Sequence, residues 1–240
     1  MKRIKVTHFL QDPAHCAVAA CAVAANHYNP KIDYEYTKKL SYKKISKKIG
    51  EEGLDTGQIC VLLNNLGFRK VTLLTSDFSA WDYSWKRYGS RKILEVLKES
   101  LAKKKDREEK SLTRSLIKWI SSEGNKSVVK ITYDFGRYIR AALNKHEPVI
   151  LTFNWTMFFE FAKENDKGEI DIANGEGVDH AVVANGYDKN GIWIVDSHHN
   201  FYTYSRKKYK KGFYKMSWEH LFTCMGQGDV IIPEDYVGNN

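Results

Sequence analysis

Gln11 and Cys16 are two side chains that acyl-transfer chemistry uses, and they lie close together near the start of the chain. The alanine-rich run after Cys16 predicts a buried helix over residues 15–28. Cys16 then lies in the first turn, where free backbone N–H groups and the helix dipole favour an anion and lower a thiol pKa. From the preceding loop, Gln11 can direct its side-chain amide toward the same point as the Cys16 N–H. The spacing predicts a thiolate nucleophile beside an oxyanion hole.

A thiolate nucleophile needs a base, and residues 178–196 contain a histidine followed by an acid. Their pattern predicts two strands joined by a turn at 188–191. His180 begins the first strand and Asp196 ends the second, so an antiparallel hairpin brings them side by side. We therefore expect His180 to act as general base and Asp196 to orient its ring.

The elements that must position these residues fall into two groups along the chain. Helices are predicted over residues 15–28, 33–49, 56–66, 90–105, 111–121, 133–143 and 218–222. Strands are predicted over residues 71–74, 149–153, 201–205 and 229–232, in addition to the two that carry His180 and Asp196. Most helices precede a mostly antiparallel sheet, which is the α+β pattern.

Length and composition are those of one domain. With 240 residues and 42% hydrophobic content, residues 1–240 can bury a single core. No uncharged apolar stretch is long enough to span a membrane, and no apolar signal region precedes Gln11. The four cysteines have no C-x-x-C spacing, which suits a reducing compartment, the cytoplasm.

Three cysteines and two histidines have more ordinary interpretations. Cys21 is about 140° around the helix from Cys16, and we expect it to be structural, as are Cys60 and Cys224. His198 and His199 follow Asp196 and suggest a metal site, but neighbours on one loop lack a spaced further ligand. We therefore predict no metal and no cofactor.

The net charge of +9 is unevenly distributed. Between Lys86 and Lys126 there are 13 Lys or Arg against 6 Asp or Glu, and a second basic cluster spans Arg206 to Lys211. The ordinary interpretation of both is a solvated face, and the alternative is a site for an acidic partner or a nucleic acid. The first cluster lies in a predicted basic helical insertion at about 77–130.

Taken in order, these residues resemble the papain-like cysteine peptidases of the group that contains the double-glycine-leader peptidases of bacteriocin exporters and their stand-alone relatives. The matching blocks are Gln11 to Cys16, Thr56-Gly57 with the helix to Gly67, Glu147 to Leu151, and His180 to Tyr187 with Asp196. There are two departures. Ala17 stands where the group usually has glycine, and Ser197 stands where it usually has proline.

The resemblance implies a papain-like fold, with the helix that carries Cys16 packed on the sheet that carries His180 and Asp196. It implies hydrolysis of a peptide or isopeptide bond in a peptide or protein substrate, through an acyl-enzyme on Cys16. Two alternatives stay open. The same acyl-enzyme can be passed to an amine or thiol by an acyltransferase, as in the phytochelatin-synthase-like enzymes, or the fold can serve as a non-catalytic binding module.

Overall fold

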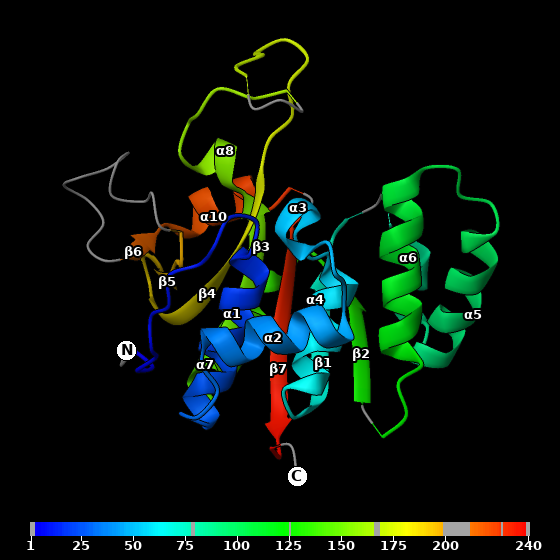
Figure 1. Cartoon of the computed structure of the whole chain (residues 1–240), viewed down its shortest axis with the longest axis horizontal. Coiled ribbons are helices and arrows are strands. Elements are labelled where there is room, and N and C mark those ends of the chain that lie inside the picture. Colours follow the sequence, from blue (N-terminus) through cyan, green and yellow to red (C-terminus); the bar gives the residue numbers. More distant parts are fainter. Residues whose placement is uncertain are drawn as a thin grey trace.

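The computed structural model of the chain describes residues 3–77, 80–124, 126–165, 169–198, 212–226 and 228–238. The described residues form a mixed α+β structure around a seven-stranded sheet with the order β2-β1-β7-β3-β4-β5-β6 (Figure 1). The strands are β1 (Phe68–Thr75), β2 (Lys126–Ile131), β3 (Val149–Asn154), β4 (Asp179–Asp188), β5 (Gly191–Val195), β6 (Phe213–Met216) and β7 (Asp229–Tyr236). Neighbouring strands are antiparallel except β1 and β2. The α+β class predicted from the sequence is confirmed.

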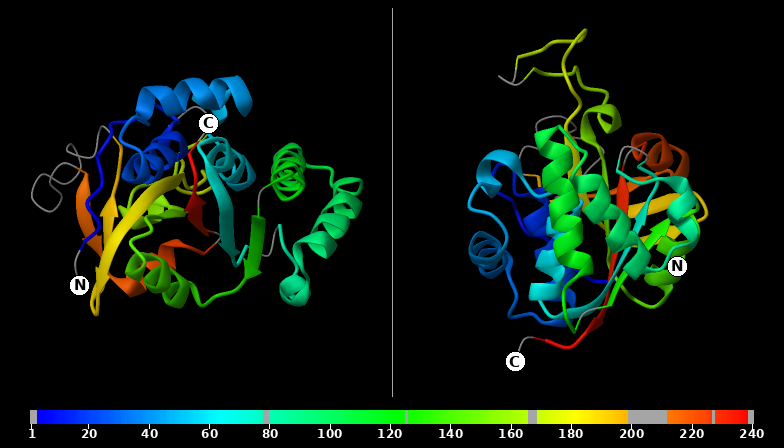
Figure 2. Two further views of the ribbon diagram at one scale, coloured as in Figure 1. Left: turned by 90° about the horizontal axis from the view of Figure 1, so that it is seen from below. Right: turned by 90° about the vertical axis from the view of Figure 1, so that its right-hand side faces the viewer.

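Helices cover both faces of this sheet. They are α1 (Cys16–Tyr28), α2 (Tyr34–Lys44), α3 (Ile49–Glu52), α4 (Thr56–Asn65), η1 (Tyr83–Arg87), α5 (Ser90–Leu101), α6 (Arg107–Ile120), α7 (Phe135–Asn144), α8 (Trp155–Phe158) and α10 (Trp218–Cys224). α1, α2 and α4 lie on one side of the sheet, and α7 and α10 lie on the other (Figure 2, left). The buried side chains accordingly form one large cluster on each side.

α1 is buried around its whole circumference. Its residues from Ala17 to Ala25 are all buried, because small side chains let the helix approach both the sheet and α2 closely. Ala181 and Val183 of β4 belong to the same apolar cluster as α1. A helix fixed in this way holds its first residue, Cys16, at the level where β4 begins.

α4 begins with a capping box at Asp55. The Asp55 side chain accepts from the Gln58 N–H, and the Gln58 side chain accepts from the Asp55 N–H, which together form a capping box. The Thr56 hydroxyl donates to the Asp229 carboxylate at 2.5 Å and ties the helix to β7. Gly57 allows a close approach of α6, because a Cβ there would lie 2.2 Å from the hydroxyl oxygen of Ser115.

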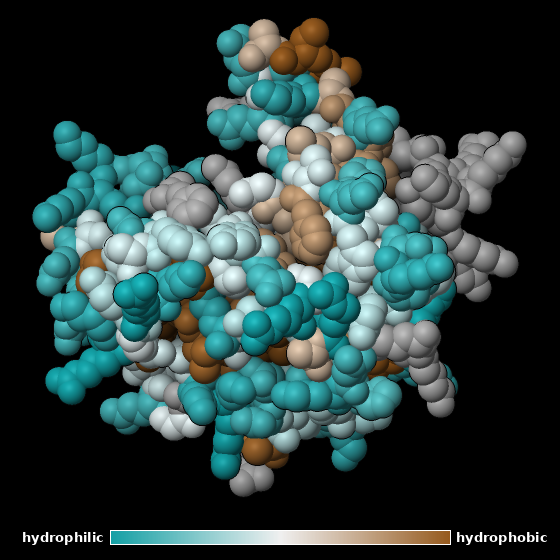
Figure 3. Space-filling model, turned by 180° about the vertical axis from the view of Figure 1, so that it is seen from behind, coloured by the Kyte–Doolittle hydropathy of each residue, from teal (hydrophilic) through white to brown (hydrophobic). Residues whose placement is uncertain are grey.

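The basic segment at about 77–130 contains η1, α5, α6 and most of β2. α6 packs against α4 and β2, and α5 packs against α6 and β2, at the β2 edge of the sheet (Figures 1 and 2). Ile93 and Leu97 of α5 are buried in the same cluster as α1. The side of the molecule where these helices lie has a largely hydrophilic surface (Figure 3, left). Strand β2, parallel to β1, was not expected from the sequence.

Other predicted elements differ mainly at their ends. The helix expected over residues 33–49 is two helices, α2 and α3. The strand expected at 201–205 and the basic cluster from Arg206 to Lys211 lie outside the described residues. In the described part, β5 pairs with β4 on one side and with β6 on the other. No helix of the described residues is long and apolar enough to cross a membrane.

Candidate active site

Cys16 is the first residue of α1, and the helix start is open to an anion. His15 occupies the N-cap position, but its side chain forms no capping hydrogen bond in the described structure, and the first turn has no acidic residue. The first backbone N–H groups of a helix have no partner within the helix, and the dipole adds positive potential there. Cys16 is half-buried, whereas Cys21, Cys60 and Cys224 are buried. Among the four free thiols, Cys16 is therefore the one most open to reagents.

His180 and Asp196 lie side by side where β4 begins and β5 ends. His180 Nε2 donates to Asp196 Oδ1 at 2.8 Å, and both residues are buried. Because Nε2 is bonded to the carboxylate, Nδ1 is the nitrogen left to face the Cys16 thiol. A hydrogen bond between the Cys16 and His180 side chains shifts the pKa of both groups.

A β-bulge puts His180 and Asp196 on one face of the sheet. Gly186 pairs with Trp193 but Ala184 pairs with Ile194, so Asn185 is the extra residue. If the pairing of Val183 with Val195 is continued by one residue, Asp196 lies opposite Val182. Val182 is two residues from His180 on the same strand, so their side chains lie on the same face. Without the extra residue, Asp196 would lie opposite Val183 and point to the other face.

The N-terminal segment forms hydrogen bonds with the extra residue of this bulge, Asn185. The Ile4 N–H donates to the Asn185 carbonyl oxygen at 2.7 Å, and the Asn185 side chain donates to the Ile4 carbonyl oxygen at 3.0 Å. Further along the same segment, His8 Nε2 donates to the Asp196 carbonyl oxygen at 2.7 Å. The segment thus connects the bulge to the acid and supports both.

Donors surround the Asp196 carboxylate. Besides His180, the His198 N–H donates to Oδ1 at 2.9 Å and the Tyr214 hydroxyl donates to Oδ2 at 3.1 Å. Burial disfavours the charge, but His180 and the His198 N–H keep the pKa of Asp196 below its usual range. Gly212, with φ 72°, permits the close packing, because a Cβ there would lie 2.2 Å from the Asp196 carbonyl oxygen.

The thiol and the imidazole stabilise each other's charged form. Burial alone would raise the pKa of Cys16, but the hydrogen bond and charge of His180, with the N–H groups of Ala181 and Ala17, bring it below the ordinary value. Burial alone would lower the pKa of His180, but Asp196 and Cys16 raise it to about 10. The arrangement favours a thiolate–imidazolium ion pair at neutral pH.

Gln11 is held beside the residue that follows the acid. Its N–H donates to the Ser197 carbonyl oxygen at 2.9 Å, and its side-chain Oε1 accepts from the Ser197 hydroxyl at 2.8 Å. The Gln11 side chain is buried. Because Oε1 is occupied, the amide NH₂ is the part of the side chain that can serve a substrate oxygen.

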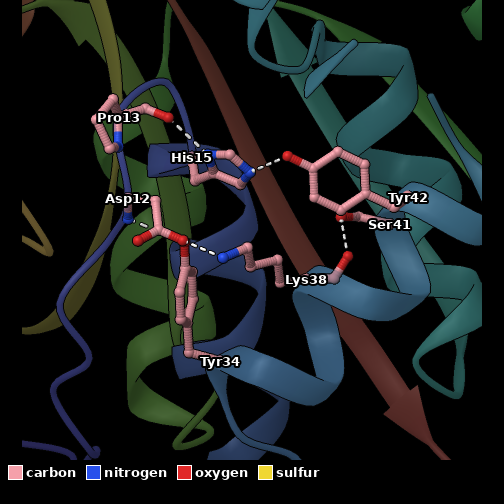
Figure 4. A network of polar contacts seen from close by, with 7 residues as sticks. All are labelled: Asp12, Pro13, His15, Tyr34, Lys38, Ser41 and Tyr42. Atoms are coloured by element: carbon pink, nitrogen blue, oxygen red, sulfur yellow. Dashed lines mark hydrogen bonds and ion pairs between the residues drawn. The ribbon is translucent and has the colours of Figure 1, made fainter. Parts of the chain in front are cut away.

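The loop between Gln11 and Cys16 is attached to α2 by two sets of contacts (Figure 4). The Asp12 carboxylate forms an ion pair with Lys38 and accepts from the Tyr34 hydroxyl at 3.1 Å. His15 donates from Nδ1 to the Pro13 carbonyl oxygen at 2.6 Å, and its Nε2 bonds with the Tyr42 hydroxyl at 3.0 Å. Both ring nitrogens of His15 are therefore engaged away from Cys16.

Aromatic rings enclose His180. The ring centroids of Trp155 and Phe153 lie 5.8 and 6.4 Å from that of His180, and Trp155 also lies 4.7 Å from His198. This wall keeps water from the bond between His180 and Asp196. No three His, Cys, Asp or Glu side chains gather to hold a metal ion in the part of the chain that the structure describes, and His199 is outside it.

The structure brings Cys16, His180 and Asp196 together and places Gln11 against Ser197, the residue that follows Asp196. It adds Ser197, Tyr214 and Trp155, to which no role was assigned from the sequence. Ser197 had one detectable signal, its position next to Asp196. Tyr214 is distant in sequence and comes into reach only because β6 pairs with β5, where Tyr214 lies opposite Ile194. Trp155 lies 25 residues before His180 in the sequence, and its ring contacts with His180 and His198 arise from tertiary packing that no local pattern indicates.

Comparisons with known proteins leave the chain without a family assignment. No family model and no curated protein matches it. Among solved structures it is similar to a protein from Bacillus anthracis proposed to be a C39-like peptidase, at 14% sequence identity and a TM-score of 0.40, over 99% of this chain and 100% of that chain. A similarity this low carries no argument about chemistry, so a function for this chain has to be argued from the geometry of its own site.

Proposed function

We propose that the chain is a papain-like cysteine hydrolase that cleaves a peptide or isopeptide bond through an acyl-enzyme on Cys16. The observation that carries the proposal is the geometry at the start of α1, where the Cys16 thiol interacts with a buried His180 whose Nε2 donates to the buried Asp196 carboxylate at 2.8 Å. This arrangement lowers the pKa of Cys16 and raises the pKa of His180 to about 10. A buried Cys and His in an ordinary core would lack both the open helix start and the carboxylate behind the ring.

In the first half-reaction, the Cys16 thiolate attacks the substrate carbonyl carbon and a C–S bond forms. The oxyanion is stabilised by the Cys16 N–H and the Gln11 side-chain NH₂. The His180 imidazolium then donates its Nδ1 proton to the leaving amine as the C–N bond breaks. Asp196 holds Nε2–H throughout, which fixes the ring orientation and stabilises its positive charge.

In the second half-reaction, neutral His180 takes a proton from water, and the resulting hydroxide attacks the thioester carbonyl. The C–S bond breaks, the acid product leaves, and the thiolate–imidazolium pair is restored. The free state of all four cysteines suits action in the reducing cytoplasm.

Limited alkylation of the whole chain tests the proposal. With limiting iodoacetamide at neutral pH, we expect Cys16 to be modified first, because the rate follows thiolate fraction and exposure. Burial raises the pKa of Cys21, Cys60 and Cys224, which makes them internal controls. His180→Ala should slow modification of Cys16 alone, and Asp196→Asn should slow it less. Equal modification of all four thiols in the native chain would reject the proposal.

A further inference from the structure

Ser197 and Gln11 are joined by two hydrogen bonds that tie the residue after the acid to the loop before the nucleophile. The Ser197 hydroxyl donates to Gln11 Oε1 at 2.8 Å, and the Gln11 N–H donates to the Ser197 carbonyl oxygen at 2.9 Å. Ser197 is 5% exposed and Gln11 is 8% exposed, so water competes little for either side chain. No step of the proposed hydrolysis uses the Ser197 hydroxyl.

The orientation of a primary amide matters for an oxyanion hole, because its two ends have opposite character. The NH₂ end donates to a developing oxyanion, whereas the oxygen end repels it. The Ser197 hydroxyl needs an acceptor because it is buried, and Gln11 Oε1 is that acceptor. If the Gln11 amide turned over, the hydroxyl proton would lose its partner and Oε1 would face the substrate oxygen.

We propose that Ser197 is a positioning residue that holds the Gln11 amide with its NH₂ end toward the substrate carbonyl oxygen. The inference rests on the proposed function and extends it. Asp196 holds the imidazole and Ser197 holds the amide, so one dipeptide orients both the base and the oxyanion donor. Ser197 is also where this chain departs from the resembling group, and proline has no hydroxyl to give this bond.

Two reagents separate oxyanion stabilisation from thiolate reactivity in the full chain. With p-nitrophenyl acetate, the Cys16 thiolate attacks the ester carbonyl, an oxyanion forms, and p-nitrophenolate leaves as the thioester forms. With iodoacetamide, the same thiolate displaces iodide from a CH₂ group and no oxyanion forms. Residues that act on the Gln11 amide should therefore affect acetylation and leave alkylation unchanged. Both rates are followed at Cys16 by mass spectrometry.

We expect Gln11→Ala to slow acetylation by about 10²-fold and Ser197→Ala to slow it by about tenfold, with alkylation of Cys16 unchanged in both. In the Gln11→Ala background, Ser197→Ala should slow acetylation no further, because the amide it orients is gone. The matched control is Ser127→Ala. Ser127 is a buried serine of β2 whose hydroxyl donates to the Trp119 carbonyl oxygen at 3.0 Å, and its loss should change neither rate.

Three results would overturn the inference. They are an unchanged acetylation rate in Ser197→Ala, an equal loss of acetylation and alkylation, and a Ser197→Ala effect of full size in the Gln11→Ala background. An equal loss would mean that Ser197 supports the fold or the ion pair. Failure of the proposed function has a different signature, because the native chain would then show no acetylation at Cys16, and both proposals would be withdrawn.

Discussion

The thiol of Cys16 and the imidazole of His180 stabilise each other's charge, and Asp196 stabilises the imidazolium. Among the residues that the structure describes, His180, His198 and Tyr214 each donate a hydrogen bond to the Asp196 carboxylate. A buried carboxylate with this many donors stays ionised, because hydrogen bonds to the charged form favour it. These contacts favour the ion pair over the pH range in which Cys16 has lost its proton and His180 has kept its own.

This range predicts the pH dependence of acyl transfer to Cys16. The acid limb should lie below the ordinary thiol pKa, because the pKa of Cys16 is lowered, and the alkaline limb should lie near pH 10, where His180 loses its proton. His180→Ala should move the alkylation profile of Cys16 to higher pH, because the hydrogen bond and charge of the imidazole then no longer oppose the effect of burial on the thiol pKa. Rates of acetylation and alkylation measured across pH check this. An unmoved profile in His180→Ala would contradict it.

Cys16, His180, Asp196 and Gln11 could be proposed from residue types and order alone, because the role proposed for each is one that few side chains can fill. The supporting residues were harder to predict. Serine and tyrosine hydroxyls occur in many surroundings. The roles of Ser197 and Tyr214 can therefore be recognised only once the structure shows which groups they bond.

At the scale of secondary-structure elements, helices could be predicted from residues close together in sequence, but the register between strands could not. The helix predicted over residues 56–66 is present as α4, and the structure has a full capping box at its start. The bulge at Asn185 was not predicted, although it decides which face Asp196 takes. A bulge depends on pairing across two strands, which the order of residues along one strand does not fix. Strand β2 was missed because its one strand partner in the sheet, β1, lies about 50 residues earlier.

The loop between Gln11 and Cys16 gives a prediction at this scale. Lys38→Met removes the ion pair with Asp12, and we expect acetylation of Cys16 to slow by several-fold and amide exchange in the loop to quicken. Ala14 in this loop has φ 59°, a strained conformation that the surrounding contacts must hold. Stability should fall by less than about 1 kcal/mol, since the Lys38 and Asp12 side chains are 28% and 46% exposed.

The matched control is Lys48→Met, which removes an exposed ion pair with Glu52 at 3.6 Å. It should change neither loop exchange nor reactivity. If Lys38→Met behaved like this control, the ion pair on α2 would have no part in holding the site.

At the scale of the whole molecule, the basic segment is separated from the site. α5 and α6 pack beside α4 and β2, and they do not cover the start of α1 in the described structure (Figure 1). The buried apolar residues of α5 and α6 join the main core, so these two helices are not arranged as a lid over Cys16. The remaining hypothesis is that the basic segment binds an acidic partner, which does not require it to cover the active site.

Charge reversal tests this hypothesis with heparin as an acidic probe. Lys103→Glu with Lys105→Glu should lower the salt concentration at which the chain leaves a heparin column, because binding through several lysines is salt-dependent. Both lysines are exposed, whereas Lys104 pairs with Glu109 at 3.1 Å and is left unchanged. Alkylation of Cys16 should not change.

The control makes the same change in net charge elsewhere, with Lys39→Glu and Lys43→Glu on the exposed face of α2. We expect it to have a smaller effect on heparin binding. An equal effect would mean that heparin responds to net charge alone and that the basic segment has no special part in binding.

The proposed hydrolysis requires that Cys16 forms an acyl-enzyme and that water resolves it. The most direct measurement is intact mass spectrometry of the chain during reaction with p-nitrophenyl acetate, continued after removal of the reagent. We expect one acetyl group at Cys16 that forms rapidly and then disappears, with neither event in Cys16→Ala and with much slower loss in His180→Ala. Acetylation distributed over lysines and other thiols, unaltered in Cys16→Ala, would contradict this mechanism.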